Sequence, residues 1–409
     1  MAQREGSVET RYGWIVVFGS LAIHTIGLGS PIVLWVALKP IAAEFDWPRS
    51  VPSLAYSMMM IGAGAGGIMM GWWMDKKGVF QPVIFGAVML GIGALVASQS
   101  EGRWSLYVAN GILIGLLGKA AMITPLVANV THWFDRRRGL AVSIIASGQG
   151  LAGAIWPPLF RLLNDEYGWR ETYMIFGIFA LCTMVPLALL LRPKAPITPL
   201  GRARDGHMMD GRVLNLPANA VQGLLCFATI GCCTAMAIPI VHLVSHGTDL
   251  GFARARAAEF LTVLFGAAFV SRILYGMLAD RIGGVLTLLI GSACQATMLL
   301  AFAYVTSLPA LYISALLFGL GFAGIMPCYP LIIRLLFPAN QAGWRIATFY
   351  MFAALGMAIG GWMGGYIFDL TGSYSNAFLA AFGFTVMNFT TIGFIYLRQT
   401  RLGLNPLPA

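Results

Sequence analysis

Apolar stretches of about twenty residues recur along the whole chain, which is the length that an α-helix needs to cross the hydrocarbon core of a bilayer. Because backbone polar groups in lipid must be satisfied within the spanning segment, stretches of this length predict helices. The sequence therefore predicts an all-α integral membrane protein with twelve transmembrane helices, at about 13–37, 51–73, 81–99, 104–131, 139–161, 170–191, 218–245, 257–278, 285–305, 309–335, 345–369 and 376–397.

The composition agrees with lipid as the main surroundings of the chain. Of the 409 residues, 10% are charged, and the mean hydropathy is +0.77, whereas about 25% of the residues of a soluble domain are charged. The net charge of +10 does not indicate nucleic-acid binding, because the basic residues lie in short loops, where they set membrane topology. The six cysteines lie in apolar stretches without metal-ligand or disulfide spacing, so we expect helix packing and no metal.

The distribution of Lys and Arg favours one orientation. With the N-terminus inside, 17 of the 26 basic residues lie on the cytoplasmic side and 7 on the outer side, so both termini are expected in the cytoplasm. The first twelve residues are polar and carry both signs of charge, so no cleavable signal peptide is expected. The longest loop is predicted to be a cytoplasmic linker at residues 193–216, between six-helix halves at 1–192 and 217–409.

An internal repeat relates the two halves. The pattern G-x-x-x-D-[K/R]-x-G follows both the second and the eighth apolar stretch, at an offset of 205 residues, and the same offset relates Pro125 to Pro330. A parallel repeat of this kind predicts a binding site near the middle of the membrane between the halves. The residues of the repeated pattern are Gly71, Asp75, Lys76 and Gly78 in the first half, and Gly276, Asp280, Arg281 and Gly283 in the second.

The paired pattern resembles the signature of the major facilitator superfamily of transporters, and the resemblance covers essentially the whole chain. It implies a fold of twelve helices in two pseudo-symmetric halves and a cytoplasmic gate formed by the eight pattern residues. The glycines are expected to let helices approach closely, and each aspartate to pair with basic residues at a helix end. The alternative is that these segments are only short charged turns.

Further segments are similar to the monocarboxylate transporters and to the oxalate/formate antiporters, which implies transport of small carboxylates by alternating access and a bacterial inner (plasma) membrane. They are Tyr12-Gly13-Trp14, Pro125 followed by residues 132–139, Arg272, His242-Leu243-Val244 and residues 248–251. The chain departs from these families at three places. Ala268 stands where many animal members have an aspartate, Ile32 follows Pro31 where they have a lysine, and residues 349–365 lack the lysine of the oxalate pattern. Proton coupling through an aspartate is therefore not carried over, and oxalate is not the expected substrate.

Two cations lie deep in predicted spans. Lys119 is roughly 20 Å from either end of its stretch, and Arg272 is roughly 12 Å inside the cytoplasmic end of its own. Ionisable groups at such depth are costly and mark functional sites. The sequence places no Asp or Glu in the middle of any stretch, and the repeat gives neither cation a twin, since the equivalent positions are Gly324 and Gly67. An anionic ligand is expected to supply the missing charge. The alternatives are a contact of Lys119 with helix-end carbonyls, and an Arg272 side chain that extends to the membrane surface.

His24, at mid-depth, is a candidate for hydrogen bonding to the substrate or for carrying the coupled proton; the alternative is a histidine bonded to a neighbouring helix. Lys119 is the other candidate for proton coupling, because its pKa can fall when the site is empty and dry. His242 and His246 are expected near the outer mouth, at a gate or on the surface. Weaker substrate-binding candidates, each also suited to an interhelical hydrogen bond, are Gln149, Tyr329, Tyr350 and Asn388.

The sequence thus favours a secondary active transporter of small organic anions, monocarboxylates such as lactate or pyruvate, with protons as the coupled partner. A carboxylate or dicarboxylate exchanger is the first alternative, and a membrane receptor for an organic anion is less favoured because the loops are too short for a signalling domain. An enzyme is not expected, since the spans contain no nucleophile–base pair and no pair of acids. No cofactor is expected, and efflux of cationic drugs would require acids rather than bases in the spans.

Overall fold

The structure is a computed structural model that describes residues 9–122, 124–134, 138–193, 212–337 and 339–402. Helices make up nearly all of this described part. The chain divides into two compact units, the first with residues 1–47 and 58–201 and the second with residues 48–57 and 202–409. The helix α3 therefore starts in the second unit and continues in the first from Met58.

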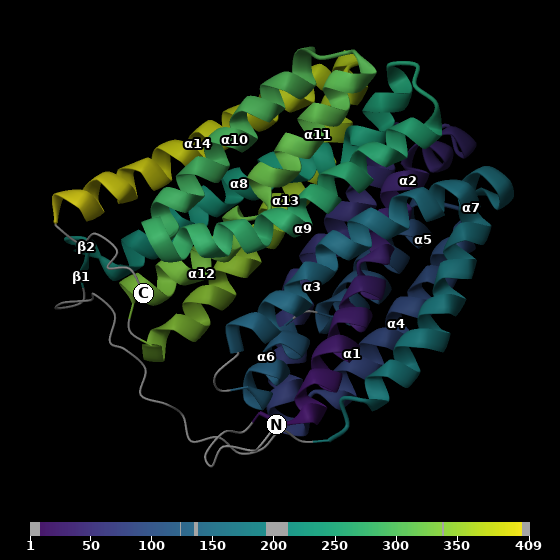
Figure 1. Ribbon diagram of the computed structural model, residues 1–409. Coiled ribbons are helices and arrows are strands. Elements are labelled where there is room, and N and C mark those ends of the chain that lie inside the picture. The colour runs from purple at the N-terminus through teal and green to yellow at the C-terminus, as the bar shows by residue number, and fades with distance from the viewer. Residues whose placement is uncertain (1–8, 123, 135–137, 194–211, 338, 403–409) are drawn as a thin grey trace. The chain divides into compact units, whose positions relative to one another are not determined.

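The first unit is a bundle of helices (Figure 1). Its fourth predicted span is divided among several short elements, among them η1, a π-helix, and η2, a 3₁₀ turn. The elements are α1 (Arg11–Gly27), α2 (Gly29–Glu44), α3 (Ser50–Lys77), α4 (Phe80–Ser98), α5 (Arg103–Tyr107), η1 (Val108–Gly118), η2 (Lys119–Ala121), α6 (Thr124–Trp133) and α7 (Arg138–Leu189).

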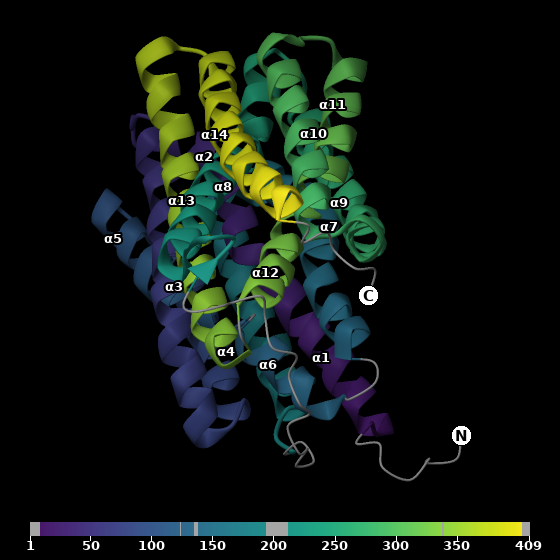
Figure 2. The same ribbon diagram turned by 90° about the vertical axis from the view of Figure 1, so that its left-hand side faces the viewer.

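The second unit contains the remaining helices and a two-stranded hairpin (Figure 2). Its tenth predicted span is also divided, into α11 and α12. The elements are β1 (Arg212–Val213), β2 (Leu216–Pro217), α8 (Ala218–Asp249), α9 (Arg254–Ile282), α10 (Gly284–Tyr304), α11 (Leu308–Phe322), α12 (Ile325–Leu336), α13 (Ala339–Thr371) and α14 (Tyr374–Arg401).

The helical membrane fold is confirmed. Eleven helical stretches of the described residues are long and apolar enough to cross a membrane, and the stretch at Ile144–Leu189 is 46 residues long. Gly168, with φ of 86° and ψ of 171°, interrupts that stretch. Because 46 residues is about twice the length of one span, this stretch contains most of both the fifth and the sixth predicted span, which gives twelve.

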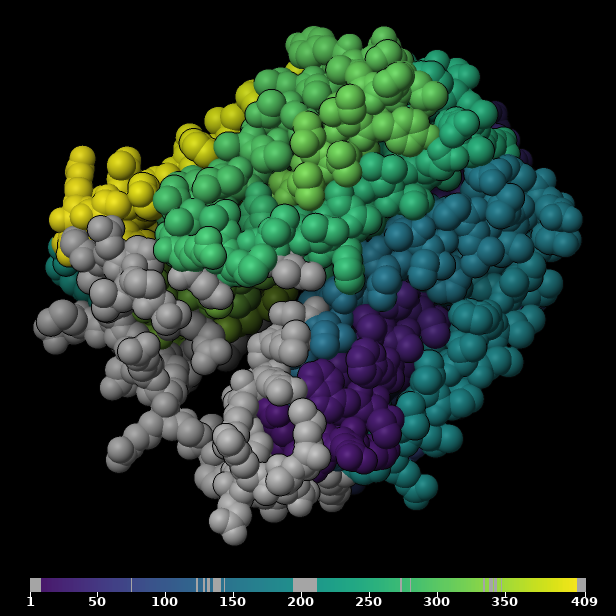
Figure 3. All heavy atoms as spheres, in the orientation of Figure 1, coloured from purple at the N-terminus to yellow at the C-terminus, as the bar shows by residue number. Residues whose placement is uncertain are grey.

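Large apolar side chains on the outside of the helices fit lipid surroundings. In the second unit they lie on α10 and α11, whose atoms are green in Figure 3, and they include Ile290, Ile313 and Leu316. Exposed apolar side chains in this number would be unfavourable in water. The outer surface of these helices is therefore expected to contact lipid.

The end of the predicted linker is folded. β1 and β2 pair antiparallel, with Val213 opposite Leu216, and Leu214 and Asn215 form the turn with positive φ angles of 55° and 57°. Val213 and Leu214 are buried in an apolar cluster with residues of α8, α10, α12 and α14. The polar linker predicted at 193–216 therefore ends in a hairpin that belongs to the core of the second unit, while residues 194–211 lie outside the described part.

The last glycine of the repeated pattern ends a helix in both units. Gly78 and Gly283 both have a φ of 84°, and their backbone N–H groups donate to the carbonyls of Met74 and Ala279, at 2.7 and 2.9 Å. A residue with a Cβ is strained at such positive φ angles. These two glycines are therefore required by backbone conformation, independently of any gate.

Replacing Gly283 with alanine is expected to lower the free energy of unfolding by about 1–2 kcal/mol, because of the positive φ. Gly71→Ala is the control, since a Cβ built at Gly71 meets no heavy atom within 4 Å among the described residues. The midpoint of thermal unfolding in detergent measures both. Equal midpoints for the two variants would show that Gly283 does not need its conformation.

Candidate functional site

Lys119 lies where the fourth predicted span changes its helix type. The span runs as a π-helix through Gly118, tightens into a 3₁₀ turn at Lys119–Ala121 and continues as α6 from Thr124. The N–H of Met122 donates to the Lys119 carbonyl at 3.0 Å, which closes the tight turn. Interruptions of this kind in a membrane helix are typical of binding sites. The predicted span is present as one helical stretch, Arg103–Val127, within which the helix type changes at Lys119.

The Lys119 side chain is half-buried in the first unit. Among the described residues, the hydrogen-bond acceptor of its ammonium group is the sulfur of Met60 on α3, at 3.8 Å from Nζ. A thioether is a weak acceptor, whereas an ammonium group has three donors. The proposed contact of Lys119 with helix-end carbonyls has no counterpart in the described structure.

Two glycines of α3 bring the backbone of this helix against the π-helix. A Cβ at Gly62 would lie 2.3 Å from the carbonyl oxygen of Gly111, and a Cβ at Gly66 would lie 2.1 Å from that of Leu116. No side chain fits at these distances, so only glycine permits this contact. α3 therefore supports the segment that carries Lys119.

His24 links α1 to the same interruption. Its Nδ1 lies 2.9 Å from the carbonyl oxygen of Met122, and because a carbonyl only accepts, Nδ1 carries the proton. A Cβ at Gly148 of α7 would lie 3.1 Å from Cδ2 of His24, and the half-buried Gln149 follows Gly148. His24 thus bonds to a neighbouring span, at the residue that closes the turn of Lys119.

In the second unit Arg272 lies on α9 and is half-buried. Tyr350, another of the predicted site residues, lies on α13 and is 49% exposed. The hydroxyl group of the neighbouring Ser271 donates to the carbonyl of Leu320 on α11. Arg272 therefore lies where α9 contacts α11, just before the tenth span is interrupted at residues 323–324.

The two units repeat this arrangement but place the cation on different helices. In each, an interrupted span packs on the helix that ends in the repeated pattern. A Cβ at Gly324, the position equivalent to Lys119, would lie 1.9 Å from Cγ of Tyr275, so no lysine fits there. At Gly67, the position equivalent to Arg272, a Cβ would meet only the Thr124 hydroxyl, at 3.8 Å, among the described atoms. Packing therefore explains why the position equivalent to Lys119 has no lysine, but it does not explain why the position equivalent to Arg272 has no arginine.

Tyr329 and Asn388 form a buried network rather than an open site. The Asn388 amide nitrogen donates to the Tyr329 hydroxyl at 2.6 Å and to the Ala228 carbonyl at 2.9 Å, and its oxygen accepts from the Ser292 hydroxyl at 2.7 Å. These bonds connect α8, α10, α12 and α14. The alternative of an interhelical hydrogen bond describes both residues better than substrate binding.

The predicted gate is only partly described. The side chains of Asp75 and Asp280 lie outside the described residues, so their pairing with basic residues stays a prediction. Lys76 lies over the ring of Trp72, with Nζ at 3.9 Å from the centroid. The close helix approach expected at Gly71 and Gly276 is not seen, since a Cβ there meets no heavy atom within 4 Å in the described part of the chain.

Comparison with known proteins agrees with this fold. The family model of the Major Facilitator Superfamily matches residues 14–220 and 223–407. Monocarboxylate transporter 13 of Bos taurus is 27% identical over 393 residues, which cover 94% of this chain and 89% of that protein. The MFS-type transporter pynF of Aspergillus niger is 26% identical, over 84% of this chain and 78% of that protein.

A solved structure shows the same fold. A bacterial homolog to the human lysosomal transporter Spinster, in an inward-facing and occupied conformation, superposes with a TM-score of 0.75 over 98% of this chain and 100% of that chain. The sequence identity is 12%, so this likeness concerns the fold alone.

Proposed function

This chain belongs to the Major Facilitator Superfamily, and on that basis we propose that it carries small carboxylates across a membrane by alternating access. It is a transporter and not an enzyme. Monocarboxylates such as lactate or pyruvate are the proposed substrates, and the similarity to proteins named monocarboxylate transporters supports this choice. The proposed membrane is a bacterial plasma membrane, with both termini in the cytoplasm.

One observation carries the proposal. Each unit holds a long cationic side chain within its spans: Lys119 of the first unit lies in an interrupted span, and Arg272 of the second lies on α9, the helix that packs on an interrupted span. The sequence offers no Asp or Glu at mid-span in either half. A buried charge is tolerated when an opposite charge neutralises it, and a carboxylate matches the planar guanidinium group in two parallel hydrogen bonds. An anionic substrate therefore suits both cations.

We assign the coupled proton to Lys119 and a positioning role to His24. The Nδ1–H group of His24 donates a hydrogen bond to the Met122 carbonyl, and this bond orients the turn that carries Lys119. A lysine next to a thioether can lose its proton when the anion leaves and regain it when an anion binds. His24 then acts on transport through Lys119, without contacting the substrate.

Uptake of labelled L-lactate into proteoliposomes tests the function. Accumulation driven by an inward proton gradient alone supports symport. Accumulation only in vesicles preloaded with unlabelled carboxylate supports the second candidate, an anion exchanger. Two cations would also suit a dicarboxylate as the substrate of such an exchanger. No uptake of lactate, pyruvate or dicarboxylates under either condition would contradict the proposal.

The His24 assignment has its own expected result. In His24→Asn the amide nitrogen takes the place of Nδ1 and keeps a donor for Met122, so gradient-driven uptake is expected to stay within about threefold of the wild type, while His24→Leu loses that bond, worth about 1 kcal/mol or more. Loss of gradient-driven uptake in His24→Asn with exchange intact would instead make His24 the proton carrier.

A further inference from the structure

The end of α14 carries two arginines, and a third arginine opens the hairpin beside it. In the second unit the end of α14, yellow in Figure 1, lies next to β1 and β2. Arg398 and Arg401 belong to the last turn of α14, and Arg212 is the first residue of β1. We call these three residues the arginine group.

Arg398 is held in place by the fold around it. Its Nη1 donates to the carbonyl of Leu214 in the turn of the hairpin, at 3.2 Å, and its guanidinium carbon lies 5.0 Å from the centroid of the Phe394 ring. Leu214 is itself buried in the apolar cluster of the unit. Arg398 therefore joins the hairpin to α14, and most of the N–H groups of its guanidinium group remain available to a further acceptor.

The arginine group has no counter-charge in the described part of the chain. None of its three members forms an ion pair among the described residues, and the sequence contains no Asp or Glu between residues 374 and 402. Membrane topology requires only that basic residues flank a span, and it does not require one of them to be positioned against a hairpin. The arrangement therefore favours a bound anion.

An exposed apolar face of α14 leads directly to the arginines. Leu397 and Arg398 follow Phe394 by three and four residues, and Arg401 follows it by seven, so the four residues lie on one face of the helix. The side chains of Phe394 and Leu397 are 42% and 56% exposed. Tyr374–Arg401 is long and apolar enough to cross a membrane. This face thus passes from the depth of acyl chains to that of headgroups within about two turns.

We propose that this face binds an anionic phospholipid, with the lipid phosphate at Arg398 and Arg401 and the acyl chains on Phe394 and Leu397. A guanidinium group matches phosphate oxygens with two parallel hydrogen bonds, and basic residues next to a membrane span attract anionic headgroups. A free phosphate ion would use the arginines but not the apolar side chains next to them. Arg212 adds a positive charge at the hairpin. The proposal does not depend on which substrate is carried.

The bound lipid has a structural consequence. Arg398 bonds to the hairpin through Leu214 and to the lipid through its other N–H groups. The lipid therefore stabilises the hairpin on α14, because a ligand that binds only the folded state shifts the equilibrium toward that state.

The first unit offers a matched control for the loss of one charge. Arg192 is exposed and lies three residues after the end of α7 at Leu189. At the offset of 205 it corresponds to Leu397, and the residue that corresponds to Arg398 is Pro193. Arg192→Gln therefore removes a positive charge near the end of a span and leaves the proposed lipid site unchanged.

Native mass spectrometry of the purified protein tests the proposal by counting bound lipids. The protein in a neutral detergent is titrated with dioleoyl phosphatidylglycerol and, separately, with dioleoyl phosphatidylcholine. The first phosphatidylglycerol is expected to bind about tenfold more tightly than the first phosphatidylcholine. Arg401→Gln is expected to weaken the binding of phosphatidylglycerol about fivefold, and Arg398→Gln/Arg401→Gln about 25-fold, since each arginine contributes a similar attraction. Arg192→Gln is expected to change it less than about twofold, as for an independent site.

Two further measurements separate lipid binding from folding. Arg398→Lys keeps the charge and a donor for the Leu214 carbonyl, so it is expected to retain most of the preference for phosphatidylglycerol, and the midpoint of thermal unfolding without lipid shows whether each variant is folded. Equal binding of the two lipids by the wild type, or unchanged binding of phosphatidylglycerol by the double variant, would overturn the proposal. Displacement of the lipid by an equal concentration of glycerol 3-phosphate would also overturn it, because the site would then be one for free phosphate esters.

Discussion

Arg272→Gln is expected to reduce carboxylate uptake at least about 30-fold, because removing one partner of a buried, hydrogen-bonded charge pair costs about 2–5 kcal/mol. The glutamine keeps polarity and approximate length but has neither the charge nor the planar fork. The same reason predicts a loss of similar size for Lys119→Gln. Initial rates of uptake in proteoliposomes, normalised to the amount of inserted protein, measure both.

Two further variants make this result specific. Arg256→Gln removes an arginine near the start of the same helix, where the side chain is exposed and pairs with Glu259, and it is expected to leave uptake within about twofold, since exposed pairs contribute about 0–1 kcal/mol. Arg272→Lys keeps the charge and is expected to retain part of the activity. If Arg272→Gln takes up carboxylate as fast as Arg256→Gln does, Arg272 is not part of the substrate site.

The second large effect is expected from Gly66→Leu. A Cβ at this position would lie 2.1 Å from the Leu116 carbonyl oxygen and 2.7 Å from the Ala120 Cβ, so α3 and the π-helix would have to separate. Overpacking of this kind typically costs about 1–3 kcal/mol, and occasionally more. Uptake should also be lost, because the separation displaces the neighbouring Lys119.

Gly71→Leu is the control for that variant. It adds the same side chain later on α3, where a Cβ meets no heavy atom within 4 Å among the described residues. The midpoint of thermal unfolding should therefore fall clearly in Gly66→Leu and little in Gly71→Leu. Equal midpoints, or a Gly66→Leu variant with normal uptake, would contradict the packing described here.

Much of the fold could be predicted from the sequence, because apolar length alone determines where a helix can cross lipid. The repeat located the two helix-ending glycines, Gly78 and Gly283, although not their reason, which is backbone conformation rather than close packing. The hairpin at 212–217 was missed. Its polar surroundings hide the apolar pair Val213 and Leu214, which are buried.

The charged residues of the candidate site could be predicted from the sequence, but the helix type of the backbone around Lys119 could not. Lys119 and Arg272 stand out because ionisable groups are rare at depth. The π-helix before Lys119 has no residue pattern of its own, although the glycines at 111, 115 and 118 hint at close contacts with neighbouring helices. For Tyr329 and Asn388 the sequence predicts an interhelical hydrogen bond or a weaker substrate contact, but it does not show that the two residues bond to each other.

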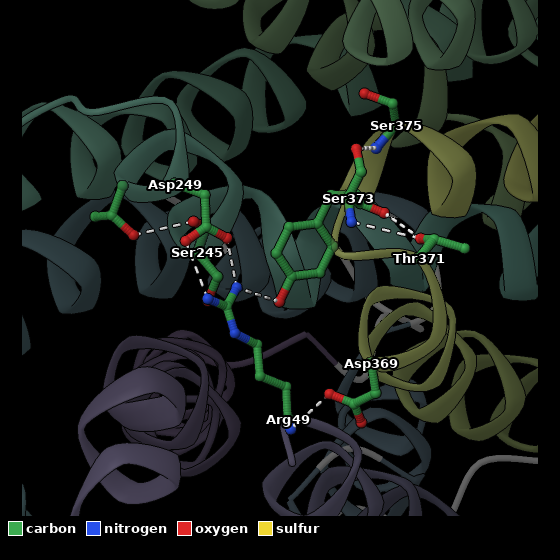
Figure 4. Close-up of polar contacts among 9 residues, drawn as sticks. Arg49, Ser245, Asp249, Asp369, Thr371, Ser373 and Ser375 are labelled. Carbon is green, nitrogen blue, oxygen red and sulfur yellow. Dashed lines mark hydrogen bonds and ion pairs between the residues drawn. The ribbon is translucent and has the colours of Figure 1, made fainter.

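The contacts of Arg49 with Asp249 and Asp369 (Figure 4) were also missed, for a different reason. Arg49 is separated along the chain by 200 residues from Asp249 and by 320 residues from Asp369, and each of the three reads as an ordinary charge near the end of a span. At the offset of 205, Glu44 corresponds to Asp249, but Glu44 pairs with Arg170 within the first unit. Sequence offset alone shows that the two acids correspond, but not that their partners differ.

Equilibrium binding of lactate to the purified protein tests the central claim most directly. The claim predicts saturable binding of labelled L-lactate to the wild type, loss of that binding in the double variant Lys119→Gln/Arg272→Gln, and no competition by the uncharged analogue lactamide. If lactate binds the double variant as tightly as the wild type, or if lactamide competes equally well, Lys119 and Arg272 do not bind the anion.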